Sequence, residues 1–504
     1  MEDGGGHTFS ITQSEDGGPG LDPSEDRFHE ECAVVGIAGH EEAANLAYLG
    51  LYSMQHRGQE GSGIVSSNGE ALISHRGLGL VADVFPEGVI RRLTGTSAIG
   101  HNRYSTAGET LLRNTQPLVA EFSLGSLAVC HNGNFVNARQ QRRRLEEDGS
   151  IFQSTSDTEV LVHLVARSKR TALIERVIDA LAQVEGAYCV LFLTEDEMIA
   201  ARDPHGFRPM VLGRFPTGGW VIASETCALD LMEAEYVREI EPGEVLHIQG
   251  NELRSVKPFA HVPTRACIFE YVYFARPDSK VFSRNVYGVR KEMGRQLARE
   301  TLVDADLVIP VPDSGVPAAL GFAEESGLPF DMGLIRNHYV GRTFIEPKDS
   351  IRNFGVKVKL NAQRDVLEGK RVIVIDDSIV RGTTSKKIVR MIRAAGAKEV
   401  HMRISAPPTM SPCYFGVDTP THGELIANNM KVEEIREYIK ADSLAYLSQE
   451  GLYAFLPKEK EPGPRTFCDA CFTRDYPVEV NHDQEARQMR LFHALEMPPG
   501  AGRS

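Results

Sequence analysis

The sequence of 504 residues contains no uninterrupted apolar stretch approaching the ~18 residues that a membrane-spanning helix needs. Its N-terminus also lacks a basic flank followed by an apolar core, which is the pattern of an export signal. The sequence therefore indicates neither membrane insertion nor export. We expect a cytoplasmic protein with no membrane partner.

Positive charge is scarce as well. The 55 Lys and Arg residues are outnumbered by 69 Asp and Glu, which gives a formal net charge of -14. Proteins that bind the phosphate backbone of nucleic acids need clustered Lys and Arg. We therefore expect no nucleic-acid partner, and anionic metabolites would depend on local dipoles and a few basic side chains.

Cysteine is sparse, with eight residues in the chain. In a large cytoplasmic protein this usage suggests a nucleophile or metal ligands before it suggests disulfides. Cys130, Cys189 and Cys227 lie in apolar, strand-like sequence. We interpret these three as small buried hydrophobic residues.

Length and patterning divide the chain into two domains and two tails. Residues 1–31 contain almost nothing apolar and are expected to be disordered. Strand patterns dominate residues 32–264, which predicts an α+β sheet sandwich with flanking helices (αββα). In residues 265–456 helices alternate with apolar strands, which predicts a parallel α/β sheet. Residues 457–504 form a charged, Pro-rich tail.

Several elements can be placed individually. A short strand is expected at Cys32–Ile37, followed by a helix through Leu51. Asn68-Gly69 is a strong hairpin signal. Ser156 to Glu159 has the spacing of a capping box that opens a helix, and a further helix is expected near 286–300.

The stretch from Val372 to Thr384 carries the strongest chemical signal. An apolar β-branched run ends in Asp376 and Asp377, and a glycine-threonine turn then opens a helix. Such carboxylates can accept hydrogen bonds from ribose hydroxyls or lie beside a magnesium ion, while N–H groups at a helix start hold a phosphate. The pattern favours a sugar-phosphate site over an ordinary connection.

This string resembles the signature of the type I phosphoribosyltransferases, which bind phosphoribosyl pyrophosphate (PRPP). A second motif, residues 312–315, precedes it in the expected order and can form a nest for pyrophosphate. The resemblance places magnesium at Ser314, Asp376 and Asp377. The residues expected to bind PRPP are Asp313, Ser314, Gly315, Asp376, Asp377, Ser378, Gly382, Thr383 and Thr384. A polar segment from Arg336 to Lys359, with Arg342 and Lys357, is a candidate lid.

Cys32 gains meaning from the motifs that follow it. These are Gln55-His56-Arg57-Gly58-Gln59, Gly100-His101-Asn102-Arg103-Tyr104-Ser105, His131-Asn132-Gly133-Asn134 and Ser156-Asp157-Thr158-Glu159. Together they resemble the class II, N-terminal-nucleophile glutamine amidotransferases. The resemblance implies that Arg103, Tyr104 and Asp157 grip glutamine, that Asn132 and Gly133 form an oxyanion hole, and that Arg57 orders the loop near the nucleophile.

The chemistry of such a nucleophile requires a free α-amine. A thiol has a pKa of about 8.5 and an α-amine one of about 7.7 to 8.0, so the amine of an N-terminal cysteine can take and return protons near neutral pH. An internal Cys32 lacks this base. Removal of residues 1–31 as a propeptide is therefore implied. The resembling enzymes usually have glycine after the nucleophile, whereas this chain has Ala33, which would be strained if that position needs a positive φ.

The C-terminal tail carries a C-x-x-C pair, Cys468 and Cys471. By itself the pair fits either zinc or an iron–sulfur cluster, because both accept four thiolates. With Cys267 and Cys413, the pair resembles the four cysteines at which one branch of the amidophosphoribosyltransferase family binds a [4Fe–4S] cluster. Such a cluster would clip the tail to the second domain.

Both halves, with the junction Ile268–Ser279, resemble the amidophosphoribosyltransferase family over nearly all of residues 32–475. The resemblance implies glutamine hydrolysis, internal ammonia transfer and attack on PRPP to give 5-phosphoribosylamine, the first committed step of purine synthesis. It also implies inhibition by purine nucleotides and a homodimer or homotetramer. A PRPP-sensing regulator would need a basic DNA-binding module, and a different class II amidotransferase would lack the two PRPP motifs.

Overall fold

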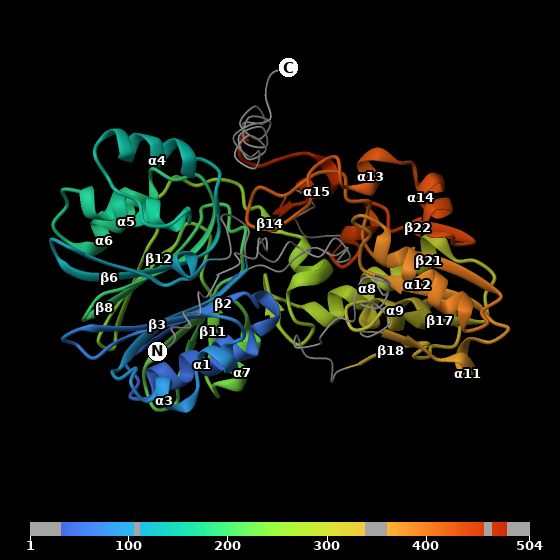
Figure 1. Cartoon of the computed structure of the whole chain (residues 1–504), viewed down its shortest axis with the longest axis horizontal. Coiled ribbons are helices and arrows are strands. Elements are labelled where there is room, and N and C mark those ends of the chain that lie inside the picture. Colours follow the sequence, from blue (N-terminus) through green and yellow to red (C-terminus); the bar gives the residue numbers. More distant parts are fainter. Residues whose placement is uncertain (1–31, 105–110, 338–359, 458–465, 481–504) are drawn as a thin grey trace, which may run out of the picture.

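The computed structural model describes residues 32–104, 111–337, 360–457 and 466–480. Figure 1 shows two lobes side by side, one built from the first half of the chain and the other from the second. The expected propeptide 1–31 lies outside the described residues. So does the candidate lid beyond Asn337, including Arg342, Lys357 and Lys359.

The first lobe, called here the double-sheet unit, contains two antiparallel sheets. One has the order β11-β9-β10-β1-β4-β2-β3 and the other β13-β12-β8-β7-β6-β5. The strands of the first are β1 (Ala33–Ala38), β2 (Gly61–Ser67), β3 (Leu72–Leu78), β4 (Ser97–Arg103), β9 (Val211–Arg214), β10 (Trp220–Ala223) and β11 (Glu235–Glu239). Those of the second are β5 (Leu118–Phe122), β6 (Gly125–Phe135), β7 (Gly186–Leu193), β8 (Glu197–Arg202), β12 (Val245–Gln249) and β13 (Glu252–Val256).

The two sheets pack face to face and helices cover their outer faces. Alternate apolar side chains of β1, β4, β6 and β7 fill the space between the sheets, as strand periodicity requires. Helices α1 (Ala43–Ser53) and α7 (Thr226–Leu231) pack on the outer face of the first sheet. On the second sheet lie α5 (Thr158–Arg167) and α6 (Leu173–Leu181), with α4 (Ala138–Glu147) beside them (Figure 1). The expected αββα sandwich is confirmed.

The second lobe, the parallel-sheet unit, contains a parallel sheet of order β17-β20-β21-β22. Its strands are β17 (Leu307–Pro310), β20 (Arg371–Asp376), β21 (Glu399–Ile404) and β22 (Ser443–Tyr446). Helices α8 (Val286–Thr301) and α9 (Val316–Ser326) cover one face, and α12 (Thr383–Ala394) and α14 (Val432–Ile439) cover the other. Both faces of β20 are therefore buried, which explains its unbroken apolar sequence.

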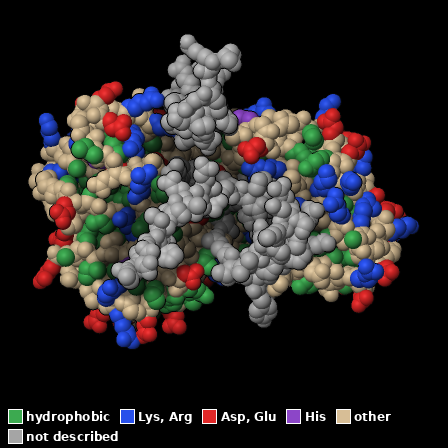
Figure 2. Space-filling view, in the orientation of Figure 1, with side chains coloured by type: hydrophobic (Ala, Val, Ile, Leu, Met, Phe, Trp, Pro, Cys, Tyr) green, Lys and Arg blue, Asp and Glu red, His purple; other side chains and the backbone are tan. Residues whose placement is uncertain are grey.

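Smaller elements complete the described chain. They are α2 (Val81–Val84), α3 (Glu87–Ile90), β14 (Ala266–Cys267), a π-helix (Glu270–Phe274), β15 (Lys280–Val281), β16 (Arg284–Asn285), β18 (Leu334–Arg336), β19 (Leu360–Ala362), α11 (Arg364–Leu367), α13 (Ile426–Asn429), β23 (Phe467–Cys468) and α15 (Ala470–Thr473). On the face shown in Figure 2, basic and acidic side chains are interspersed. No helix in the described segments is long and apolar enough to cross a bilayer.

Most individual elements agree with expectation and two details do not. The strand after Cys32, the helix through Leu51, the hairpin at Asn68-Gly69 and the helix near 286–300 are all present. Cys227 was expected in a strand but begins α7, although it is buried as expected. The capping box at Ser156 is also wrong and is described with the site.

Candidate active sites and a cysteine cavity

Cys32 lies at the start of β1, in the middle of the first sheet. Its thiol is buried and lies 3.5 Å from the carbonyl oxygen of Tyr104, to which it can donate a hydrogen bond. The next residue, Ala33, is extended and pairs with Asn102 of β4. Because Ala33 has no positive φ, the strain considered for this position is absent.

Arg103 and Tyr104 reach the nucleophile because β4 runs beside β1. Arg103 is the last residue of β4 and is buried, and its Nη1 donates to the carbonyl oxygen of Asn114 at 3.0 Å. The following residues, 105–110, are outside the described chain. The structure thus brings Cys32, Arg103 and Tyr104 to the same end of the sheet.

Asn132 and Gly133 lie in β6 of the facing sheet. The Asn132 side chain is 1% exposed, and neither its Oδ1 nor its Nδ2 has a hydrogen-bond partner among the described residues. A buried amide without partners is rare in proteins, which makes the Asn132 side chain a candidate for contact with a substrate. Gly133 has φ +145°, and a Cβ there would lie 2.0 Å from the carbonyl oxygen of Ala187, so only glycine fits.

Asp157 stands at the N-terminus of α5, close to the same strand. Its Oδ2 accepts a hydrogen bond from the N–H of Phe135 at 3.0 Å and lies 3.7 Å from Nδ1 of His131. Burial alone would raise the pKa of Asp157, but His131 and the N–H groups of Phe135 and Thr158 outweigh burial and lower it. Asp157 is therefore a fixed negative charge, suited to hold an ammonium group.

The expected capping box of α5 is not formed. The Glu159 carboxylate accepts hydrogen bonds from the N–H groups of Gln153 and Ser154 rather than from the helix cap. Ser156 instead accepts from the N–H of Thr158 at 3.3 Å. The helix itself is present, because the loop before it folds back and pairs the backbone N–H groups that the capping box would have satisfied.

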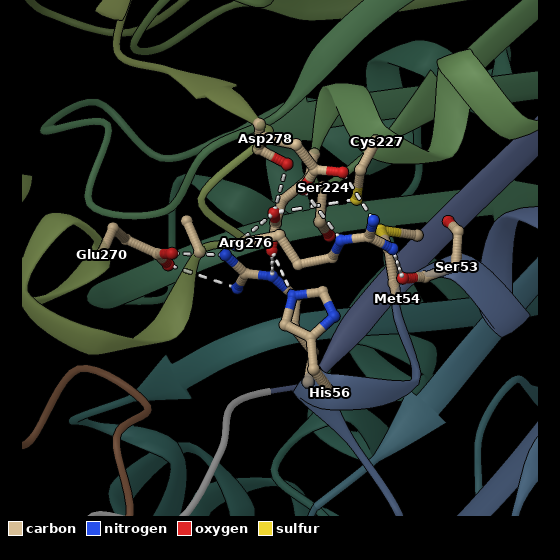
Figure 3. Close-up of polar contacts among 12 residues, drawn as sticks. Ser53, Met54, His56, Ser224, Cys227, Glu270, Arg276 and Asp278 are labelled. Carbon is tan, nitrogen blue, oxygen red and sulfur yellow. Dashed lines mark hydrogen bonds and ion pairs between the residues drawn. The ribbon is translucent and has the colours of Figure 1, made fainter. Parts of the chain in front are cut away.

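Arg57 occupies the boundary between the two units rather than the surface. Its guanidinium pairs with Glu225 of the double-sheet unit and with Glu270 of the junction, and all three side chains are fully buried (Figure 3). Arg208 lies 3.6 Å from Glu270. Burial would raise the pKa of Glu225, but Arg57 and His56 lower it well below its usual range.

Glu225 also organises the start of the second unit. It accepts hydrogen bonds from the hydroxyl of Ser279 at 2.6 Å and from the N–H of Arg276 at 2.9 Å, and Arg276 in turn donates to the carbonyl of Ser53 at 3.0 Å (Figure 3). We call this set the junction network. Its charges are paired across the boundary, which fixes the orientation of the two units.

In the parallel-sheet unit, the two motifs singled out from the sequence meet at the carboxyl ends of β17 and β20. The hydroxyl of Ser314 donates to Oδ2 of Asp377, and the hydroxyl of Ser378 donates to Oδ1 of the same carboxylate at 2.6 Å. Asp376 accepts the N–H of Asp377 at 3.0 Å. We call this arrangement the strand-end site. Arg336 reaches it by an ion pair with Asp313, 2.7 Å.

Two glycines allow this site to be compact. A Cβ on Gly315 would lie 2.6 Å from the carbonyl oxygen of Ile375, so a larger residue would push the two motifs apart. Gly382 has φ +77° and precedes the first turn of α12, where Thr383 and Thr384 lie. The Oγ1 of Thr383 is buried without a hydrogen-bond partner in the described chain, as expected for a group that faces a ligand.

Four cysteines from distant parts of the second half line a single small cavity. These are Cys267, Cys413, Cys468 and Cys471, and the rest of the wall is apolar or aromatic apart from Thr419. In the described part of the chain no three His, Cys, Asp or Glu converge closely enough to hold one metal ion. Four thiols around one cavity are a donor set that both an iron–sulfur cluster and zinc accept.

Burial and neighbouring thiols disfavour ionisation of the cysteines in this cavity. Burial raises the pKa of Cys468 to about 12 and that of Cys471 well above its usual range, and the neighbouring thiols raise both further. Four thiolates here would therefore need metal to compensate their charge. Burial also raises the pKa of Cys189, which lies between the two sheets, to about 12.

Backbone hydrogen bonds hold the tail segment 466–480 around the cavity. Cys267 and Cys468 pair in the two-stranded parallel sheet β14-β23. The N–H groups of Met410 and Ser411 both donate to the carbonyl oxygen of Cys471, at 2.8 and 3.1 Å. Apolar side chains of the tail add to this attachment, since Phe467 and Phe472 are buried in the core of the second unit.

Sequence reasoning missed the residues that connect the sites. His131 was quoted within a motif, but its contact with Asp157 was not foreseen. Glu225, Glu270 and Arg208 carry no local signal, because a lone charged residue in a sequence is usually solvated. Only an Arg or Glu inside an otherwise apolar stretch, such as Ile268–Phe274, hints at a buried pair.

Comparison with known proteins adds an independent line of evidence. A family model described as "Glutamine amidotransferase domain" matches residues 101–231. The chain is 55% identical over 467 residues to "Amidophosphoribosyltransferase 2, chloroplastic" of Arabidopsis thaliana, covering 92% of this chain and 82% of the relative. It is 50% identical over 457 residues to "Amidophosphoribosyltransferase" of Bacillus subtilis (strain 168), covering 90% and 96%.

Solved structures agree with these relatives. One, titled "Structure of the allosteric regulatory enzyme of purine biosynthesis", has a TM-score of 0.86 at 50% identity and covers 90% of this chain and 97% of that one. Another is titled "Glutamine phosphoribosylpyrophosphate (PRPP) amidotransferase from B. subtilis complexed with ADP and GMP". Its TM-score is 0.85 at 50% identity, with 90% and 98% of the two chains covered.

Proposed function

This chain belongs to the amidophosphoribosyltransferase family, and we propose that its two sites perform the two half-reactions of that family. The enzyme is a glutamine-dependent pentosyltransferase that acts in the first step of purine biosynthesis. Glutamine supplies ammonia, which displaces pyrophosphate from PRPP to give 5-phosphoribosylamine. We assign glutamine hydrolysis to residues 32–264 and phosphoribosyl transfer to residues 265–456.

We assign the nucleophile of the first half-reaction to Cys32. The thiolate adds to the glutamine amide carbon, ammonia leaves, and water then releases glutamate from the thioester. The proton carrier is the α-amine of Cys32 itself, once cleavage after Glu31 has freed it. The observation that carries this assignment is the unpartnered Asn132 amide beside Gly133, which can stabilise the oxyanion by ~3 to 4 kcal/mol per donor.

Arg103, Tyr104 and Asp157 are proposed to hold the glutamine substrate. Arg103 would bind the α-carboxylate and Asp157 the α-ammonium, consistent with the lowered pKa of Asp157. Arg57 acts indirectly, because its charge is already paired with Glu225 and Glu270. Its proposed role is to order the loop that leads from α1 to β2.

The strand-end site is proposed to bind PRPP. Asp376 and Asp377 accept hydrogen bonds from the ribose hydroxyls, while Ser378 and residues 382–384 hold the 5′-phosphate at the start of α12. Asp313, Ser314 and Gly315 hold the pyrophosphate. Exclusion of water matters on both sides of the boundary, because ammonia would be protonated in water and PRPP would be hydrolysed.

Two cofactors are proposed from the donor sets. Magnesium would be held near Ser314, Asp376 and Asp377, whose oxygens are the ligands it prefers, and would neutralise the leaving pyrophosphate. A [4Fe–4S] cluster would be held by Cys267, Cys413, Cys468 and Cys471. Its proposed role is structural, because neither half-reaction transfers electrons. The alternative is zinc, which metal analysis would identify.

Regulation, assembly and location are further proposals. Purine nucleotides are proposed as inhibitors, since one similar enzyme was solved with ADP and GMP. A homodimer or homotetramer is proposed, and light scattering would decide between them. The cytoplasm is the proposed location; the plant relatives are named chloroplastic, so a fluorescent fusion that accumulates in plastids would overturn it.

The function is tested by separating the two half-reactions. We expect Cys32→Ala to abolish glutamine-dependent pyrophosphate release from PRPP while high ammonia still supports it. Cys189→Ala, which alters a buried cysteine between the sheets, is the control and should retain both activities. Loss of ammonia-dependent activity in Cys32→Ala, or retention of glutamine use, would contradict the assignment.

A further inference from the structure

The loop that carries Cys413 lies between the cysteine cavity and the strand of the proposed oxyanion hole. Cys413 and Phe415 line the cavity, and the N–H of Phe415 donates to Sγ of Cys413 at 3.3 Å. Residue Gly416 follows directly. We call residues 413–417 the cavity loop.

The cavity loop is fastened to the double-sheet unit at three successive residues. Nδ2 of Asn134 donates to the carbonyl oxygen of Tyr414 at 2.9 Å. Nε and Nη2 of Arg208 donate to the carbonyl oxygen of Phe415 at 3.1 and 2.6 Å. The ring of Phe415 stacks on that of Phe207, with centroids 4.4 Å apart and planes inclined by 14°.

The third of these residues, Gly416, lies close to Gly133 itself. Gly416 has φ +102°, and a Cβ there would lie 2.9 Å from both Cα and the carbonyl carbon of Gly133. A Cβ on Gly133 would in turn lie 2.0 Å from the carbonyl oxygen of Ala187. The peptide of Gly133 is therefore confined between β7 and the cavity loop.

We propose that the cavity loop is a positioning element for glutamine hydrolysis, in which Asn134 and Gly416 hold the Gly133 peptide in the orientation that the oxyanion requires. This inference rests on the oxyanion role proposed above for Asn132 and Gly133. Neither Asn134 nor Gly416 touches the reacting atoms. The consequence is that the occupant of the cysteine cavity affects glutamine chemistry through geometry, although it takes part in no step.

The size of the effect follows from the sensitivity of oxyanion stabilisation to position. A displacement of about 1 Å costs up to about 100-fold in rate, and loss of one donor costs about 100- to 1,000-fold. Removing one fastening hydrogen bond should displace the peptide only partly. We therefore expect kcat for glutamine to fall between about tenfold and about 100-fold, with little change in KM.

The test compares Asn134→Ala and Gly416→Ala with Asn137→Ala. Asn137 lies two residues beyond β6. Its Nδ2 donates to the carbonyl oxygen of Gln183 and its Oδ1 accepts from the N–H of Glu185, both within the double-sheet unit, so Asn137→Ala removes amide hydrogen bonds away from the loop. Each variant is assayed with glutamine and with ammonia. Iron and sulfide content and the cluster absorbance show whether the cavity is still filled.

A second readout addresses the oxyanion hole without turnover. Glutamate γ-semialdehyde, in which an aldehyde replaces the amide, accepts the Cys32 thiol at its carbonyl carbon; the C–S bond forms and the carbonyl oxygen takes up the proton. The resulting adduct places that oxygen in the hole. We expect its affinity to fall with kcat in Asn134→Ala, while KM for glutamine and the ammonia-dependent rate are kept.

The outcomes are distinguishable. Reduced kcat and weaker aldehyde binding in Asn134→Ala and Gly416→Ala, with cluster content and ammonia activity intact and Asn137→Ala near wild type, support the inference. Equal behaviour of all three variants overturns it. Reductions in kcat that occur only in variants that have lost the cluster also overturn it. They would mean that these residues act on the folding of the tail and not on the Gly133 peptide. Failure of Cys32→Ala to abolish glutamine use would instead overturn the underlying function.

Discussion

Arg57 and Glu270, which are 213 residues apart in the sequence, form an ion pair across the boundary of the two units. Both side chains are fully buried, so neither charge can be compensated by water. A buried pair contributes little when intact, because its desolvation offsets the Coulombic attraction. Its importance is that removing either partner alone would leave the other with one partner fewer in a fully buried setting.

The first prediction concerns this pair. Glu270→Gln leaves Arg57 and Arg208 with one carboxylate fewer in a buried setting, and we expect it to destabilise the protein by about 3 to 5 kcal/mol. Urea unfolding followed by fluorescence would measure the change. Glu87→Gln, which breaks an exposed pair with Arg91, should cost less than about 1 kcal/mol. Equal values for the two variants would show that the junction network is not critical.

The second prediction concerns pH. The pKa of Glu225 is lowered in the folded protein, so the unfolded chain binds more protons there. The Glu225 carboxylate therefore contributes its full stability above the ordinary value of 4.5, and this contribution is lost as the pH falls below it. We expect the stability of the wild type to decline more steeply between about pH 5 and 3 than that of Glu225→Gln. Parallel curves would contradict the role of Glu225.

A third prediction addresses the strand-end site through its acid pair. Asp377→Asn should weaken PRPP-dependent synthesis with either nitrogen source, because the amide cannot accept from both Ser314 and Ser378, as the carboxylate does, and also from the proposed ribose hydroxyl. Alkylation of Cys32 by a glutamine-like electrophile should be unchanged. Initial rates over a range of PRPP and magnesium concentrations are the measurement, and an unaltered dependence on PRPP would place the ribose elsewhere.

The fourth prediction uses Gly315. A Cβ at this position would lie 2.6 Å from the carbonyl oxygen of Ile375, so Gly315→Ala should separate the two motifs and lower PRPP-dependent turnover by about tenfold or more. Gly423→Ala is the matched control, because a Cβ there meets nothing within 4 Å. Wild-type turnover in Gly315→Ala would mean that the two motifs need not be close.

The fifth prediction concerns the cysteine cavity. Cys468→Ser should give protein without cluster colour, and the segment 466–480 should become more sensitive to protease, because the cavity cysteines help to attach this segment beside its buried Phe467 and Phe472. Limited proteolysis with mass spectrometry would locate the cuts, and Cys189→Ala should resist them. If wild-type protein purified without oxygen contains zinc and no iron, the site holds zinc in place of a cluster, and zinc attaches the tail. Four reactive thiols in a protein of unchanged stability would exclude both the cluster and zinc.

The sequence by itself determined the chemistry-bearing motifs and the fold class. An apolar run followed by Asp376 and Asp377 is a local pattern, and so is the order of motifs after Cys32. Their chemistry depends on residue type and on position at a strand end, both of which can be read along the chain. For the same reason, β1 and α8 were expected within one residue of where they lie, and a helix was expected over the residues of α1.

Only the tertiary structure decided which distant groups meet. Nothing near Arg57 in sequence indicates that Glu225 and Glu270 compensate its charge, because the pairing depends on how β-sheets and the junction pack. The expected capping box is absent because the backbone N–H groups of Gln153 and Ser154, in a loop that folds back, donate to the Glu159 carboxylate. The confinement of Gly133 by Ala187 and Gly416 depends on backbone distances across two units. Local sequence carries residue type and spacing, whereas long-range contact is a property of the packed chain.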